Sequence, residues 1–341
     1  MGRVQINPEA LKWARIDAGY EYSNLPNKIK PKFKEWENGK LMPTWNQLCD
    51  ISKYFKRPTA FFFREKFPDH INMDFIEYRK LDSYESDIKS PSLTIGIREA
   101  ISKRKNFLEL MEDMHYPIAS FGRYKLNSRN ISELSNHIRD ILKIDLNQQK
   151  SWLYNNGRKD SAHYTFLNNW KEHISSKLGV LIFEIPRVSL NEMRALCIYY
   201  DEYPIILLNS ADSPNARIFS IFHELTHLIL GESAICDVDK SNSKEWLCNS
   251  VAAEFLVPKN DLMKHPIVVK KQSNWTIEEL SKKRSSGGRS PVLNQIKYNG
   301  KLYTQLFLTA YENGVISSVE FSQSVGLRLK HVDELTEKLF Q

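Results

Sequence analysis

Apolar positions recur at helical spacing through the first half of the chain. Residues 8–67 predict a small all-helical unit, in which Leu11, Ala14 and Ala18 share one face. Residues 69–165 are highly charged and mostly helical in pattern, and no internal repeat or low-complexity tract interrupts them. We therefore expect a helical connector between the first unit and the second half of the chain.

The pattern changes after residue 177, where short apolar runs predict three strands, over 179–183, 195–200 and 204–208. A helix is expected next, with Ser213 as N-cap, Pro214 at its first position and Gly231 just after its end. A second helix should begin near Ser243 and end before Pro258. The remaining residues are helical in pattern, with a Gly/Ser-rich interruption at 285–290.

Composition narrows the class of protein. The 341 residues are 41% hydrophobic and 26% charged, which is typical of globular proteins and excludes wholesale disorder and fibres. The longest uncharged apolar runs, such as Tyr203 to Leu208, are too short to span a membrane, and the first residues do not form a signal peptide. Four irregularly spaced cysteines argue against a disulfide framework. We expect a cytoplasmic protein with no membrane partner.

Charge is unevenly distributed around a net +7. Residues 1–68 carry 13 Lys or Arg and 7 Asp or Glu, and residues 259–341 carry 13 and 8. Residues 167–258 carry 7 and 12. Basic ends favour nucleic acid and an acidic middle favours a cation, although solvated surface charge gives the same asymmetry.

One motif carries chemistry. The helix expected from Pro214 contains His223-Glu224-Leu225-Thr226-His227, an HExxH sequence. Histidines four residues apart project from one helix face, so their ring nitrogens can reach one metal ion. Glu224 lies beside them and can accept a proton from water at the metal. The alternative is a buried helix whose histidines bond to the backbone, and the apolar flanks fit either interpretation.

A catalytic zinc site needs a third protein ligand and one open position. The metzincin continuation is absent, because Leu230 occupies its glycine position. Glu245, on the second helix and separated from His227 by 17 intervening residues, has gluzincin-like spacing. Glu254 lies nine residues further, about 900° around the helix, so only one of the two can face the metal. Spacing favours Glu245 and leaves other candidates open: Glu232, Asp237, Asp239 and Glu254.

The segments FSIFHELTHLILGE and EWLCNSVAAEFLVP resemble the ImmA/IrrE family of metallo-endopeptidases. Its second helix has the form E-x-x-x-N-x-F-A-A-E-x-L-x-P, and this chain departs from it at Val251. The resemblance implies that Glu245 is the third zinc ligand beside His223 and His227. Asn249, one turn beyond Glu245, is a candidate to support a ligand, with helix packing as the alternative. Candidates to stabilise an oxyanion are Tyr199, Tyr200, Asn209 and Arg217.

The segments INPEALKWARIDAG and EWENGKLMPTWNQLCDISKYFKRPTAFFF resemble the Xre/Cro-type helix-turn-helix that often precedes this protease domain. The chain departs from that pattern between Gly19 and Trp36, where it is short and contains Pro26 and Pro31. We expect these prolines to break helices, so that the recognition helix is shortened or lost. DNA binding through residues 1–68 and a docking or homodimer module are the two alternatives.

The expected architecture is α+β and mostly helical. It comprises a helix-turn-helix-like bundle (residues 1–68), a helical connector (69–165), a zincin-like domain with a small sheet (166–262) and a C-terminal helical domain (263–341). The resemblance implies a zinc endopeptidase, with Mn²⁺ also accommodated, that cleaves a helix-turn-helix repressor in a stress, mobile-element or phage-defence system. The alternative is a DNA-binding regulator or antitoxin-like module with a structural or sensory metal site.

Overall fold

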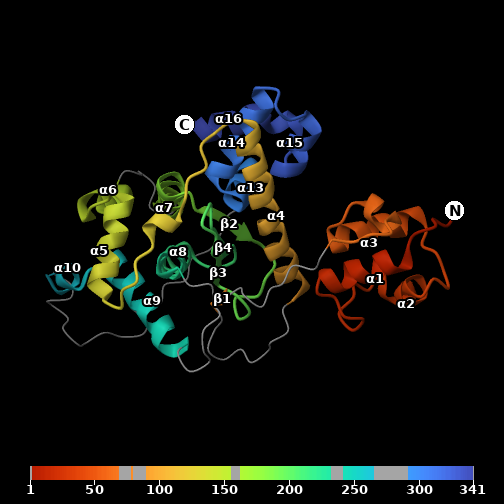
Figure 1. Ribbon diagram of the computed structural model, residues 1–341, viewed down its shortest axis with the longest axis horizontal. Helices are drawn as coiled ribbons and strands as arrows, with labels where there is room; N and C mark the ends of the chain where they lie inside the picture. Colours follow the sequence, from red (N-terminus) through yellow and green to blue (C-terminus); the bar gives the residue numbers. More distant parts are fainter. Residues whose placement is uncertain are drawn as a thin grey trace.

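The computed structural model describes residues 2–68, 78–79, 90–154, 162–231, 241–264 and 291–340. It is mostly helical with one small sheet, as expected for an α+β fold (Figure 1). Among the described helices, none has both the length and the apolarity needed to cross a bilayer. The Gly/Ser-rich interruption at 285–290 and the ligand candidates Glu232, Asp237 and Asp239 lie outside the described residues.

The N-terminal unit contains three α-helices and a short 3₁₀ helix: α1 (Pro8–Asp17), α2 (Lys30–Glu37), α3 (Trp45–Phe55) and η1 (Thr59–Phe63). Thr44 caps α3 in a reciprocal capping box with Gln47. The helices enclose their own apolar core, whose large members include Phe33, Trp36 and Phe55. This local capping and helical periodicity made the unit predictable from sequence.

The segment that departs from the helix-turn-helix pattern forms turns rather than a helix from Tyr22 to Ile29. Pro31, expected to break a helix, instead lies in the first turn of α2. Proline is tolerated there because the N–H groups of the first turn have no partner within the helix. That expectation was therefore wrong for Pro31, and an eight-residue helix remains.

The long helix α4 (Pro91–Asp113) joins this unit to the rest of the chain (Figure 1). Arg98 is buried and donates to the carboxylate of Asp17 and, at 2.7 Å, to the carbonyl of Phe55. Ile95 packs into the N-terminal core. The other faces of α4 contact the sheet and the C-terminal helices. This segment thus packs on both neighbours.

The sheet has the strand order β1-β3-β4-β2 and comprises β1 (Tyr78–Arg79), β2 (Leu181–Ile185), β3 (Ala195–Ile198) and β4 (Ile205–Asn209). Strands β2 and β4 are parallel, whereas β3 is antiparallel to β4 and to β1. The three strands expected after residue 177 are present with small shifts of their ends. The sequence did not predict β1, which is too short to show an alternating pattern.

Both faces of the sheet are buried, and its side chains alternate between two cores. Leu181 and Phe183 belong to a core with α4 and the C-terminal helices, whereas Ile182 belongs to a core with the helices around α8. Among the described residues, the helices between α4 and the C-terminal group are α5 (Ile131–Leu142), α6 (Leu146–Tyr154), α7 (Ala162–Leu178), α8 (Pro214–Leu230), α9 (Ser241–Leu256) and α10 (Lys259–Lys264).

The C-terminal helices cover the α4 side of the sheet (Figure 1). They are α13 (Pro291–Asn299), α14 (Lys301–Glu312), α15 (Ser318–Val325) and α16 (Val332–Phe340). Tyr303 and Phe307 of α14 are buried in this core, where their rings stack at 4.5 Å. Two further 3₁₀ turns are η2 (Gly122–Tyr124) and η3 (Leu329–His331). Two layers of helices therefore enclose the sheet and hold α8 against one face.

Candidate metal centre

Helix α8 is stiff and almost wholly buried. Ser213 caps it by accepting a hydrogen bond from the backbone N–H of Ala216 at 3.2 Å, and Pro214 follows at the first position. Gly231 ends it in a left-handed conformation, with φ of +68°. Burial on the sheet fixes the direction in which His223 and His227 point.

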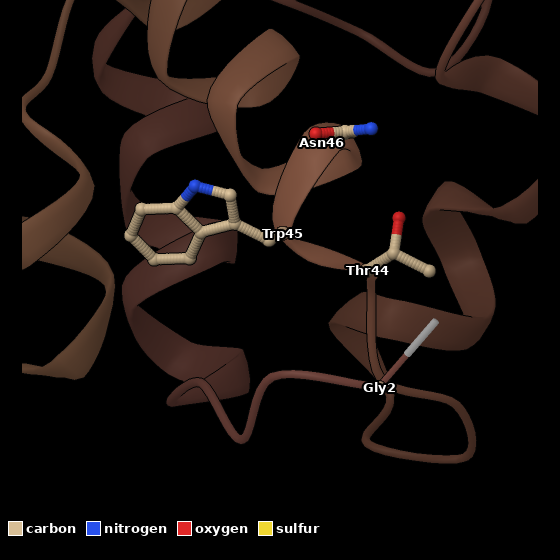
Figure 2. Close-up of a pocket in the computed structure, with 4 residues that line it drawn as sticks. All are labelled: Gly2, Thr44, Trp45 and Asn46. Carbon is tan, nitrogen blue, oxygen red and sulfur yellow. The ribbon is translucent and has the colours of Figure 1, made fainter.

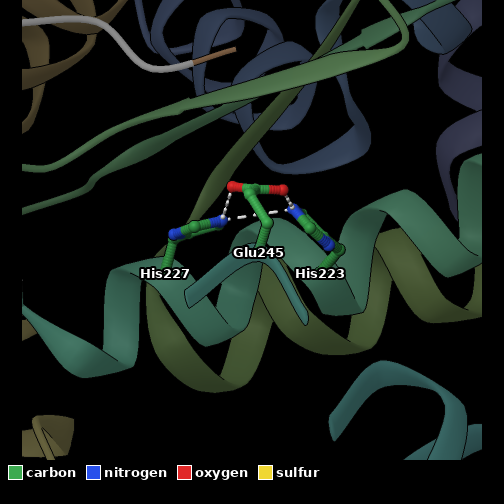
Figure 3. A group of neighbouring side chains, drawn as sticks. All are labelled: His223, His227 and Glu245. Atoms are coloured by element: carbon green, nitrogen blue, oxygen red, sulfur yellow. Dashed lines mark hydrogen bonds and ion pairs between the residues drawn. The ribbon is translucent and has the colours of Figure 1, made fainter. Parts of the chain in front are cut away.

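His223 and His227 converge on Glu245 of α9 (Figure 3). The Nε2 atoms of the two histidines are 3.1 Å apart. The Nε2 atom of His223 lies 3.2 Å from Oε2 of Glu245, and that of His227 lies 3.1 Å from Oε1. Tetrahedral zinc with bonds of 2.0–2.2 Å needs donor atoms separated by about 3.3–3.5 Å. The observed separations of 3.1–3.2 Å are slightly shorter than this, and the donor set is one that zinc accepts.

Asn249 determines which nitrogen of His223 faces Glu245. Its Oδ1 atom lies 3.0 Å from Nδ1 of His223. Because an amide oxygen only accepts hydrogen bonds, Nδ1 carries the proton and Nε2 keeps its lone pair for a metal. Asn249 thus contacts the ring nitrogen of His223 that faces away from Glu245.

The carboxylate of Glu245 is held ionised. Burial by itself would raise its pKa, but when the facing Nε2 atoms of His223 and His227 are protonated, their hydrogen bonds and charge outweigh burial and hold the pKa well below its ordinary value. When these nitrogens are unprotonated, they offer lone pairs to a metal instead. An ionised carboxylate and two imidazole nitrogens are ligands typical of zinc peptidases. The three side chains could therefore hold a divalent ion without any change of fold.

The other carboxylates considered from sequence lie differently. Glu224 is buried on α8 directly after His223, with 2% of its surface exposed, and does not belong to the three converging side chains. Glu254 accepts a hydrogen bond from the backbone N–H of Lys259 at 3.2 Å, so it caps the start of α10. Of the described carboxylates on α9, Glu245 meets the histidines and Glu254 does not.

Two of the four oxyanion candidates have structural roles. Asn209 is fully buried and donates to the carbonyls of Val188 and Met193, which holds the loop before β3. Arg217 is buried beside Glu184, with Nη1 2.6 Å from Oε2. The hydroxyl of Tyr199 bonds to Asp201, and the ring of Tyr200 lies 3.6 Å below the guanidinium of Arg104.

Sequence reasoning missed the ionic cluster that anchors α8. The carboxylate of Glu184 lies 2.9 Å from Nζ of Lys171 and 3.5 Å from Nζ of Lys297, in addition to Arg217. These four residues come from α7, β2, α8 and α13. No local sequence pattern predicts such a cluster, because its members are far apart in the chain.

A hollow lies elsewhere, at the N-terminal end of α3 (Figure 2). Gly2, Thr44, Trp45 and Asn46 line it, and the ring of Trp45 is half exposed. None of the three converging side chains lines this hollow. It belongs to the N-terminal unit.

Comparison with protein families gives a match over residues 176–279, to the family described as the IrrE N-terminal-like domain, Peptidase_M78. The matched region is less than a third of the chain and includes His223, His227 and Glu245. This match supports a metallopeptidase of the ImmA/IrrE type. Comparisons with curated proteins and with solved structures gave no match.

Proposed function

We propose that the protein is a zinc-dependent endopeptidase of the gluzincin type. The convergence of His223, His227 and Glu245, with their donor atoms within 4.8 Å of one another, carries this proposal. The match to the IrrE N-terminal-like domain supports the same class of enzyme. Mn²⁺ would also suit this ligand set, since imidazole and carboxylate bind both ions.

The residues divide into holding and proton-moving groups. His223, His227 and Glu245 would hold the ion, and Asn249 would keep His223 in the required tautomer. When bound, zinc supplies a Lewis acid that makes water more acidic and a carbonyl more electrophilic. Glu224 accepts a proton from the attacking water and returns it to the leaving amine.

The proposed substrate is a protein partner, namely a helix-turn-helix transcriptional repressor in a stress, mobile-element or phage-defence system. The resemblance to ImmA/IrrE endopeptidases suggests this substrate class. The net negative charge of residues 167–258 supports it, because a DNA-binding repressor presents basic surface. We propose that the N-terminal and connector regions contribute to recognition of this partner.

Metal analysis tests the proposal directly. We expect about one zinc per chain in the purified protein, and its loss in both His223→Ala and Glu245→Ala. Zinc lost only from His223→Ala would move the third ligand to another residue. A wild-type protein that takes up no metal after zinc is supplied would exclude the peptidase.

A second candidate function is DNA binding by the N-terminal unit. Exposed lysines follow one another along and just before α2, at Lys28, Lys30, Lys32 and Lys34. Lysines so placed can neutralise phosphates, and the exposed Trp45 lies at the start of α3. In this alternative the metal site is structural or sensory. In a gel-shift assay with the DNA upstream of the gene, binding should weaken steeply between low and moderate salt. Binding that does not change with salt concentration would exclude this DNA-binding function.

A further inference from the structure

Two side chains from the connector helices bind the C-terminal end of α9. Nε2 of Gln149, on α6, donates to the carbonyl of Leu256 at 2.9 Å. Arg139, on α5, donates to the carbonyl of Phe255. Its guanidinium also donates to Oε1 of Gln149 at 3.3 Å, which connects the two side chains. Carbonyls in the last turn of a helix have no partner within it, and a cation there complements the helix dipole.

The same arginine adjoins an aromatic cluster that joins α9 to α8. The guanidinium of Arg139 lies 4.3 Å from the centre of the Phe255 ring. The Phe255 ring stacks on Phe222 with centres 4.2 Å apart, and Trp170 contacts both edge-on. Phe222 immediately precedes His223. The contacts that Arg139 makes with α9 are therefore continuous with the packing of α9 against α8, the helix that carries the two histidines.

We infer that Arg139 and Gln149 are positioning residues for the metal centre. They fix the C-terminal end of α9, and because a helix is stiff they thereby fix where Glu245 lies relative to the two histidines. Glu245 is ten residues from Phe255, about 15 Å along the helix. A small rotation or slide of α9 would move the carboxylate by more than the roughly 0.2 Å tolerance of metal–ligand distances.

This inference rests on the proposed zinc binding and extends it to residues outside the matched region. The α5 helix also packs its apolar face on α9, with Leu134, Ile138 and Leu142 in the same core as Leu247 and Val251. Helices α5 and α6 therefore support α9, which carries Glu245, and do not serve only as a connector between the N-terminal unit and the second half of the chain.

Arg104 provides a matched control for contacts that stabilise without positioning. Like Arg139, it is half-buried, lies against an aromatic ring and donates to backbone carbonyl oxygen, in its case to the carbonyls of Glu202 and Tyr203. It lies on α4, among neighbours from the other core, and the described contacts of its side chain do not involve α9. Loss of Arg104 therefore tests general destabilisation alone.

The experiment measures the zinc dissociation constant by chelator competition, together with the melting temperature of the full chain. We expect R139M and Q149L each to weaken zinc binding by about tenfold, the loss typical of groups that support a metal ligand. R104M should lower the melting temperature and leave zinc affinity within about twofold of wild type. R139K should restore part of the affinity, because its ammonium can still donate to the Phe255 carbonyl.

A double-substitution cycle distinguishes positioning from a general effect. The cycle uses E245Q, which keeps a neutral oxygen donor and a weakened, measurable affinity. If Arg139 acts through residue 245, R139M should weaken zinc binding much less in the E245Q background than in wild type. An undiminished effect there, or wild-type affinity in both R139M and Q149L, would overturn the inference. If R139M does not fold, Q149L decides the question by the same measurements. If wild type and H223A are equally unable to bind zinc, the proposed function fails and this inference fails with it.

Discussion

Oδ1 of Asn249 accepts a hydrogen bond of 3.0 Å from Nδ1 of His223. Asn249 lies on α9, one helical turn after Glu245. Helix α9 therefore contributes both a direct metal-binding candidate and the group that orients a histidine of α8. Two helices joined by side chains of this kind can present three donor atoms with little freedom, which favours tight metal binding.

Removing the amide should weaken metal binding. We expect N249A to raise the zinc dissociation constant by about 10- to 100-fold, because the His223 ring loses its fixed tautomer and orientation. N249D keeps an acceptor oxygen and should stay near wild type. Chelator competition measures both. Wild-type affinity in N249L, which keeps a similar volume and has no acceptor, would show that Asn249 acts through helix packing instead.

Replacing the proposed base should separate chemistry from metal binding. We expect E224Q to retain one zinc per chain while cleavage of the repressor falls by about 10²- to 10⁴-fold, since a glutamine cannot accept the proton. Metal analysis and a cleavage assay with each candidate repressor measure the two effects. If wild type and E224Q leave every candidate intact, the proposed substrate class is wrong.

The ionic cluster around Glu184 should make stability depend on pH. Burial alone would raise the pKa of Glu184, but Lys171, Arg217 and Lys297 outweigh it and hold the pKa below its ordinary value. A carboxyl with a depressed pKa stabilises the fold above its unfolded pKa of about 4.3, and this contribution is lost as pH falls through the lower folded value.

We therefore expect E184Q to lower the free energy of unfolding by about 3–5 kcal/mol at neutral pH, because it leaves buried cations without their carboxylate. The difference from wild type should hold down to about pH 5 and shrink below about pH 4. E172Q is the control, since Glu172 is half exposed beside Lys301 and should cost no more than about 1 kcal/mol. Denaturant unfolding across pH measures both; a pH-independent difference would contradict the assignment.

The attachment of the N-terminal unit should depend on Arg98. We expect R98M to destabilise this unit by about 3 kcal/mol, because Asp17 and the carbonyl of Phe55 lose a buried charged donor. Hydrogen exchange should rise at the ends of α1 and α3 and stay unchanged in α8. K105M, which removes an exposed ion pair on the same helix, should have no effect. Increased exchange throughout the chain would contradict local attachment.

Much of the metallopeptidase region could be predicted from local sequence. The spacing of His223 and His227 places both on one face of α8, and Ser213, Pro214 and Gly231 mark its ends by backbone chemistry that needs no distant partner. The strands after residue 177 were predictable because each is a short apolar run bounded by turn residues. The position of Pro31 was misjudged, because its effect depends on where α2 begins.

Sequence alone determined that two histidines share a helix face and that one carboxylate of the next helix can join them, since helical periodicity is a local property of the backbone. Only the tertiary structure decided that Glu245 meets them while Glu254 caps α10. That choice depends on how α9 is rotated against α8. This rotation is set by the packing of Phe222 on Phe255 and by the hydrogen bond that Arg139 donates to the carbonyl of Phe255. These contacts join residues distant in the chain, so no local pattern encodes them.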